Sequence, residues 1–165
     1  MSELAESRHS SALEKVLEHL FVGDLLRCLG QRGIWDVEVL RSEVDSSGYD
    51  LVVECKDTMR HIQLKASHQD ARAQSVKINK KLESKRSGCV IWMFYDRDLQ
   101  LGPFLWFGAA PGLPMPSLGD KIAKHTKGDQ TGKKAERPNI RVLAKSRFKR
   151  RESMKELVGA LFGVN

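Results

Sequence analysis

The stretch GYDLVVECKDTMRHIQLKAS, residues 48–67, decides which fold this sequence favours. Two short apolar runs within it are joined by a polar connection, as in a β-hairpin. Side chains along a strand alternate between the two faces, so Asp50 and Glu54 share a face of the first strand, and Gln63 and Lys65 share a face of the second. A hairpin that only covered a core would not need acids, an amide and a lysine there. The stretch therefore predicts a functional site.

Length and composition indicate an ordinary globular chain. It has 165 residues, of which 41% are hydrophobic and 30% charged, and we expect a single domain, 1–165. The start of the chain lacks the pattern of a signal peptide, and the longest apolar run, 89–95, is too short to span a bilayer. Cys28, Cys55 and Cys89 form no close pair, which argues against a disulfide framework or a zinc site. We therefore expect a cytoplasmic protein without a membrane partner.

The positive charge is concentrated in one basic C-terminal segment, 121–151. This segment holds 12 Lys or Arg and only two acids, so it carries +10, whereas the whole chain carries +7. Such a density suits a polyanion, most simply the phosphates of a nucleic acid, although a solvated lysine-rich surface is the alternative. The expected phosphate-binding residues lie in this segment and in a predicted basic helix before it: Lys77, Lys80, Lys81, Lys133, Lys134, Arg147, Lys149 and Arg150.

The rest of the chain alternates between helical and strand patterns. Apolar residues at helical spacing predict a first helix over 11–29, with Ser10 or Ser11 as its N-cap and Gly30 or Gly33 as its stop. Further helices are expected at 67–85, where Ser67 and Asp70 resemble a capping box, at 120–127 and at 153–162. Strands besides the hairpin are expected at 34–40, 89–95, 103–108 and 140–146. This order predicts an α/β fold, a mixed central sheet flanked by helices.

The hairpin, read with this order of elements, resembles the PD-(D/E)XK nuclease superfamily, which has the restriction-endonuclease-like fold. Asp50 matches the first acid of that family's motif, and the run Gln63 to Lys65 matches the second element, 13 positions later. The Gln-x-Lys variant, with Gly48 two residues before the acid, looks most like the Mrr-type and Holliday-junction-resolvase-like branches. The resemblance covers about residues 10–95. The triplet alone arises by chance about once per 170 positions, so the weight comes from its context.

The resemblance implies a metal-dependent nuclease that hydrolyses phosphodiester bonds, most simply in DNA. It implies Mg²⁺ or Mn²⁺ as cofactor, with Asp50 as the carboxylate ligand, the amide oxygen of Gln63 as a second ligand and the carbonyl of Leu64 as a third. It implies that Lys65 acts on the attacking water and on the charge of the transition state. A homodimer is compatible with this expectation.

A further acid is expected from the first helix, because the amide of Gln63 binds a cation less strongly than a carboxylate does. Glu14, Glu18 and Asp24 are the candidates. Glu18 lies at the edge of the helix's apolar arc and is favoured, with Asp24 a close second and an ordinary solvated role for Glu18 as the alternative. Glu54 could add a second ligand or pair with a lysine.

Two other classes of function remain open. One is a non-catalytic nucleic-acid-binding module that keeps the nuclease fold, since the unusual residue, Gln63, lies in the site itself. The other is a protein-interaction domain whose basic segment is only solvated. Salt-dependent binding to nucleic acid would distinguish a nuclease from the protein-interaction domain. Metal-dependent cleavage would distinguish a nuclease from the non-catalytic binding module.

Overall fold

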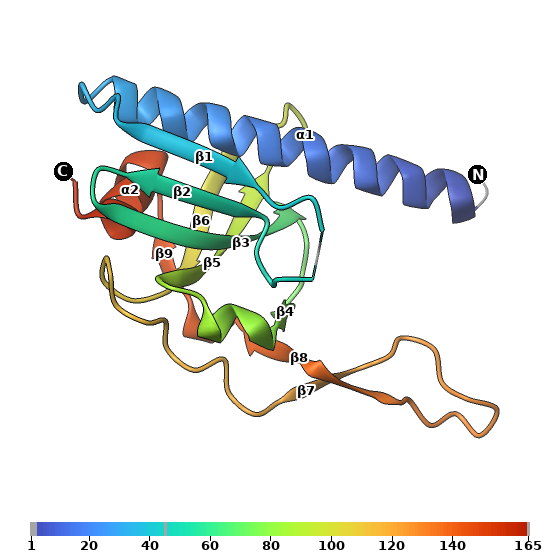
Figure 1. Ribbon diagram of the computed structural model, residues 1–165. Coiled ribbons are helices and arrows are strands. Elements are labelled where there is room, and N and C mark those ends of the chain that lie inside the picture. The colour runs from blue at the N-terminus through green and yellow to red at the C-terminus, as the bar shows by residue number, and fades with distance from the viewer. Residues whose placement is uncertain (1–2, 45, 165) are drawn as a thin grey trace.

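The computed structural model describes residues 3–44 and 46–164 of the chain (Figure 1). Its elements are two α-helices, nine strands and two short 3₁₀ helices. In chain order they are α1 (Glu3–Gly30), β1 (Val37–Arg41), β2 (Leu51–Cys55), β3 (Thr58–His68), β4 (Ser75–Asn79), η1 (Lys80–Ser84), β5 (Gly88–Tyr95), β6 (Leu101–Phe107), β7 (Ile122–Lys124), β8 (Glu136–Ala144), η2 (Lys145–Arg147), β9 (Lys149–Arg151) and α2 (Met154–Phe162).

The strands form two sheets. The larger has the order β1-β2-β3-β5-β6-β9 and the smaller the order β4-β8-β7. In the larger sheet β3 runs parallel to β5, whereas the other neighbours are antiparallel. The predicted mixed α/β sheet is therefore confirmed, and β3, the second strand of the hairpin, lies in its middle.

Both α-helices pack on one face of the larger sheet. From α1 the residues Leu17, Phe21, Leu25 and Leu29 are buried at intervals of four, which is the spacing of one helical face. They join Leu51, Val53 and Ile62 of the hairpin, and Leu157 and Leu161 of α2, in the main hydrophobic cluster. In Figure 1 α1 crosses this face, and α2 lies on the same side, near the C-terminal end of α1. This packing fixes the position of α1 against the hairpin.

The smaller sheet covers the opposite face. Ile78 of β4, Leu82 of η1 and Leu143 of β8 are fully buried against Val90 of β5 and Phe107 of β6. The two sheets thus enclose a second core, and the side chains of β3 that point away from α1 face the smaller sheet.

The predicted helix over 67–85 is wrong. β3 continues to His68, and the hydroxyl of Ser67, expected to cap the helix, accepts a hydrogen bond from the Trp92 indole N–H at 2.9 Å. Val76 and Ile78 alternate with Lys77, so the segment follows a period of two once β8 pairs with it as a strand. The sheet pairing therefore overrides the helical spacing of Ile78 and Leu82, the few apolar residues that favoured a helix here.

Other boundaries differ from the sequence prediction in smaller ways. Helix α1 begins at Glu3, so Ser10 and Ser11 lie inside it, and it ends at Gly30 as expected. The predicted helix at 120–127 is wrong, because β7 and β8 pair there as a hairpin. The predicted terminal helix is confirmed, and Ser153 caps it by accepting a hydrogen bond from the Glu156 N–H. Cys28, Cys55 and Cys89 are free and buried.

Arg60 ties the start of β3 to the C-terminal end of α2. The side chain is fully buried, and its guanidinium donates to the carbonyl oxygens of Leu161 at 2.7 Å, Ala109 at 3.0 Å and Ala160 at 3.3 Å. The same group lies over the Trp106 ring, 5.2 Å from its centroid. A cation at a helix C-terminus satisfies carbonyls that the helix itself leaves unbonded. Burial lowers the pKa of Arg60 from its ordinary value.

Candidate active site

The site forms where β2 and β3 separate. Their pairing ends at Leu51 and Ile62, and β3 continues for six residues beyond that pair. Asp50, the residue just before β2, donates its backbone N–H to the Ile62 carbonyl at 2.9 Å. Its carboxylate Oδ2 then accepts the backbone N–H of Leu64 at 2.7 Å. The Asp50 side chain thus continues the hydrogen-bond ladder where the neighbouring strand ends, and this fixes its position against β3.

Gln63 joins the same group of atoms. Its amide Nε2 donates to Asp50 Oδ2 at 2.6 Å and to the Leu64 carbonyl at 3.3 Å, and the residue is only 6% exposed. One carboxylate oxygen and one carbonyl oxygen are therefore gathered around a single amide nitrogen. Lys65, the next residue but one, lines the same pocket.

The acids of α1 approach this group from the helix side. Glu18 is 8% exposed and lines the pocket, and its carboxylate contacts Arg41 at 3.3 Å and Lys15 at 3.2 Å. Glu14, one turn earlier, lines the pocket from an exposed position. Asp24 pairs with Arg27 at 2.8 Å further along the helix and is not among the residues that line the pocket. The structure thus brings two of the three candidate helix acids to the pocket.

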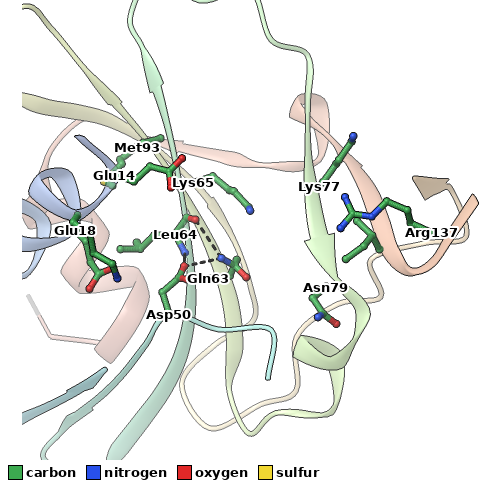
Figure 2. A pocket seen from close by; sticks show the side chains of 13 residues that line it. Glu14, Glu18, Asp50, Gln63, Leu64, Lys65, Lys77, Asn79, Met93 and Arg137 are labelled. Atoms are coloured by element: carbon green, nitrogen blue, oxygen red, sulfur yellow. Dashed lines mark hydrogen bonds and ion pairs between the residues drawn. The ribbon is translucent and has the colours of Figure 1, made fainter. Parts of the chain in front are cut away.

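The opposite wall comes from the smaller sheet. Lys77 and Asn79 of β4, with Arg137 and Ile140 of β8, line a pocket of about 400 Å³ together with the residues above. Figure 2 shows Glu14, Glu18 and Asp50 on one side, Lys77 and Arg137 on the other, and Lys65 extending between them. The pocket therefore has an acidic wall, suited to a cation, and a basic wall, suited to a phosphate.

Asp50, Gln63, Leu64, Lys65 and Glu18 all line this pocket, and their chemical roles stay predictions. Glu54 is exposed and lies opposite Glu38 and Met59, away from the pocket residues. Sequence reasoning did not single out Arg137, which it counted only as part of the basic segment. It also missed Arg41, which holds Glu18, and no local pattern around Arg41 indicated this contact.

The predicted phosphate-binding residues are spread over several elements. Lys77 lines the pocket, while Lys80 and Lys81 lie on η1, where Lys81 donates to the Ser46 carbonyl at 3.0 Å. Lys133 and Lys134 lie in the loop that joins β7 to β8.

Three others belong to or border β9, the edge of the larger sheet opposite β1. Arg147 donates to the Ser117 carbonyl at 2.7 Å, Arg150 pairs with Glu152 at 2.5 Å, and Lys149 is exposed. Glu152 raises the pKa of Arg150 through this hydrogen bond. Binding by these eight residues stays a prediction.

The chain is similar to the solved structure of a bacterial homing endonuclease, I-Ssp6803I, with 17% sequence identity over 67% of this chain and 77% of that chain. The TM-score is 0.29, and at this value the likeness does not assign the chain to a fold family. No protein-family model matches the sequence, and no curated protein matches it either.

The distribution of metal-binding side chains bears on the kind of site. Within residues 3–44 and 46–164, no three His, Cys, Asp or Glu side chains gather closely enough to hold a metal ion by themselves. A cation in this pocket would therefore depend on amide and carbonyl oxygens beside the carboxylate of Asp50.

Among the helices described, none is both long and apolar enough to cross a membrane.

Proposed function

We propose that this chain is a metal-dependent nuclease that hydrolyses phosphodiester bonds, most simply in DNA. One observation carries the proposal. The Asp50 carboxylate and the Leu64 carbonyl converge on the Gln63 amide, in a pocket that also holds Lys65, a buried glutamate and two cationic side chains. The resemblance of the hairpin to the PD-(D/E)XK motif supports the same assignment of roles.

The donor set fits a hard divalent cation such as Mg²⁺ or Mn²⁺. Both cations prefer oxygen ligands, and Asp50 Oδ2 and the Leu64 carbonyl already face one point, where the Gln63 nitrogen donates to both. With its amide turned over, Gln63 would offer its oxygen beside these two, so Asp50, Gln63 and Leu64 would be the residues that hold the cation. When bound, the cation would supply an acidified water and neutralise charge on the phosphate.

The chain's own residues would do the remaining work. Lys65 Nζ would hold the attacking water and offset charge on the phosphate oxygens in the transition state. Lys77 and Arg137 would bind the phosphate from the opposite wall, Arg137 through its planar guanidinium. Glu18 would orient water from the helix side, because Arg41 and Lys15 fix its carboxylate.

A cleavage assay tests the proposal. The full chain is incubated with Mg²⁺ or Mn²⁺ and with linear, branched, single-stranded and modified DNA, and with RNA, beside a chelator control. We expect metal-dependent cleavage that falls at least 100-fold in Asp50→Asn and in Lys65→Ala. Lys65→Ala should keep its affinity for the substrate, since the basic surfaces, rather than Lys65, supply most of the binding.

Asp57→Asn and Lys155→Ala are the matched controls, because both residues are exposed and do not line the pocket. They should cut like the unmodified chain. Cleavage that persists in both site variants would assign the activity to a contaminant or to another site.

The alternative is a nucleic-acid-binding module without catalysis, and one observation favours it. Gln63 is an amide where the family more often has an acid, and its nitrogen already satisfies Asp50. Salt-dependent binding without cleavage of any substrate would support this alternative. The protein-interaction alternative would be supported if affinity for nucleic acid were absent or independent of salt.

A further inference from the structure

The loop between β7 and β8, with the strand ends beside it, forms an exposed arm, which we define as residues 124–139. Every residue of the arm is exposed, and in Figure 1 it projects away from the two sheets as a long hairpin. It carries five cationic residues and two acids, Asp129 and Glu136. The cations are Lys124, Lys127, Lys133, Lys134 and Arg137. An arm without core contacts and with excess positive charge is suited to an outside partner of negative charge.

The tip of the arm has a defined turn. Asp129 Oδ1 accepts the Thr131 N–H at 2.9 Å, the Thr131 hydroxyl at 2.6 Å and the Lys133 N–H at 3.0 Å. Backbone bonds join Gly132 to Asp129 and Asp129 to Lys133, each at 2.9 Å, and Gly132 adopts a φ of +80°. The carboxylate of Asp129 is therefore directed at its own turn, while Lys133 and Lys134 remain on the surface.

A large bulge at the base sets the direction of the arm. Ile122 pairs with Arg141, whereas the next residue, Ala123, pairs with Arg137, so β8 has three extra residues at this point. Arg141 is 8% exposed and donates to the Pro138 carbonyl within the bulge at 2.6 Å. Bulges change the direction of a strand and of its side chains. Here the bulge places Arg137, the last cation of the arm, in the wall of the Asp50 pocket.

From this continuity we propose that the arm is a hairpin that lies in the major groove of duplex DNA while the adjoining phosphate backbone of the DNA enters the pocket. The inference rests on the proposed function, because it takes the pocket as the place where a phosphodiester binds. Arg137 belongs both to the arm and to the pocket wall, so one duplex can contact both. Arg141 is a positioning residue that holds the bulge.

The chemistry of the arm favours duplex DNA over other nucleic acids. Residues 124–139 contain no Phe, Tyr or Trp, so the arm lacks the aromatic platforms on which single-stranded bases stack. The two sides of the arm are joined by the Lys124–Glu136 strand pair and by the loop bonds His125–Ala135 and Asp129–Lys133, so it is two chains wide. An element two chains wide, such as a two-stranded ribbon, fits the major groove of B-form DNA, which is about 12 Å wide. The major groove of A-form RNA is too narrow and deep for side chains to read, so duplex RNA is excluded from the proposal.

Binding measured in the presence of a chelator separates this inference from catalysis. The first probe is a mixed-sequence duplex DNA, compared with the same sequence as single strand and as duplex RNA. We expect duplex DNA to bind most tightly. Lys133→Ala/Lys134→Ala should weaken it about tenfold and reduce the slope of log affinity against log salt by about two, because each phosphate contact contributes about 0.9. The matched control, Arg27→Ala/Lys155→Ala, removes two exposed charges outside the arm and should leave the slope unchanged.

A second probe tests the groove. The same duplex is prepared with glucosylated hydroxymethylcytosine, whose sugars fill the major groove. The unmodified chain should lose at least tenfold in affinity. A variant in which residues 126–134 are replaced by Asn-Gly should bind weakly and should not discriminate between the two duplexes.

This replacement is compatible with the fold, since His125 N–H already bonds the Ala135 carbonyl at 2.9 Å across the ends of the shortened turn. Equal unfolding midpoints of the two chains confirm that it folds. Arg141→Ala, which keeps every charge of the arm, should also reduce discrimination between the two duplexes.

Equal affinity of the unmodified chain for the glucosylated and plain duplexes would overturn the major-groove assignment, and tighter binding to RNA or to single strands would overturn the choice of duplex DNA. A chain that binds through the arm but never cuts would retain this inference and contradict the nuclease. A chain that cuts equally well without the arm would retain the nuclease and contradict this inference.

Discussion

The carboxylate of Asp50 accepts the backbone N–H of Leu64, two residues beyond the last β2–β3 pair, at 2.7 Å. A side chain thereby takes the place of a neighbouring strand at one rung of the sheet. The bond has two effects. It satisfies a main-chain donor that the end of β2 would leave without a strand partner, and it holds a negative oxygen beside the Leu64 carbonyl.

Asp50 should therefore contribute to stability as well as to function. Asp50→Ala leaves the Leu64 N–H and the Gln63 amide without this acceptor, and we expect the free energy of unfolding to fall by about 1–3 kcal/mol. Asp50→Asn keeps an acceptor oxygen and should cost less than half as much. Denaturant unfolding of both variants measures this, and equal losses would show that the bond to Leu64 does not carry the effect.

Gln63→Glu should make stability depend on divalent cations. The new carboxylate would face Asp50 Oδ2, 2.6 Å from the present amide nitrogen, so the metal-free variant should unfold more easily. Added Mg²⁺ should restore its unfolding midpoint and raise it more than in the unmodified chain. Gln69→Glu, at an exposed position, is the control and should respond to neither condition. A Gln63→Glu variant that is indifferent to Mg²⁺ would argue against a cation at this point.

The pair of Arg41 and Glu18 should position the acid without adding much stability. The side chain of Arg41 is 37% exposed, and ion pairs with such exposure contribute less than about 1 kcal/mol. A double-mutant cycle of Arg41→Ala and Glu18→Gln, measured by denaturant unfolding, should give a coupling below that value. Both single variants should slow cleavage with a smaller loss than Asp50→Asn. A coupling well above 1 kcal/mol would make the pair structural.

Cys89 should make the folded chain sensitive to alkali. Burial raises the pKa of this thiol from 9.0 to about 12, with nearby Arg60 opposing the shift. Since the folded pKa is the higher one, the folded state keeps its proton longer, and its stability is lost as pH rises from about 9 toward 12. Unfolding measured across this range should show a steeper decline than in Cys89→Ala. Identical slopes in the two proteins would contradict the assignment.

The hairpin could be predicted from sequence because its information is local. Asp50 and Gln63 are 13 residues apart within one hairpin, and the period of two places Gln63 and Lys65 on one face. The main core could be predicted equally well, since Leu17, Phe21, Leu25 and Leu29 repeat every four residues.

The basic wall of the pocket could not be predicted in the same way. Arg137 reaches it only because β8 pairs with β4 across more than 50 residues of chain and then bulges opposite β7. Lys77 was expected on a helix, and its true position depends on the same pairing. Both errors come from long-range strand pairing, which the helical stripe of Ile78 and Leu82 concealed.

The buried guanidinium of Arg60 has a consequence for the dynamics of the site. Its bonds to Ala160 and Leu161 fasten the last turn of α2 to the strand that carries Gln63 and Lys65. Detaching α2 would leave a desolvated charge without these acceptors, so fraying of this helix is coupled to opening of β3. The amides of α2 and of β3 should therefore exchange hydrogen with solvent at similar rates, as members of one cooperative unit, whereas the arm exchanges independently and far faster.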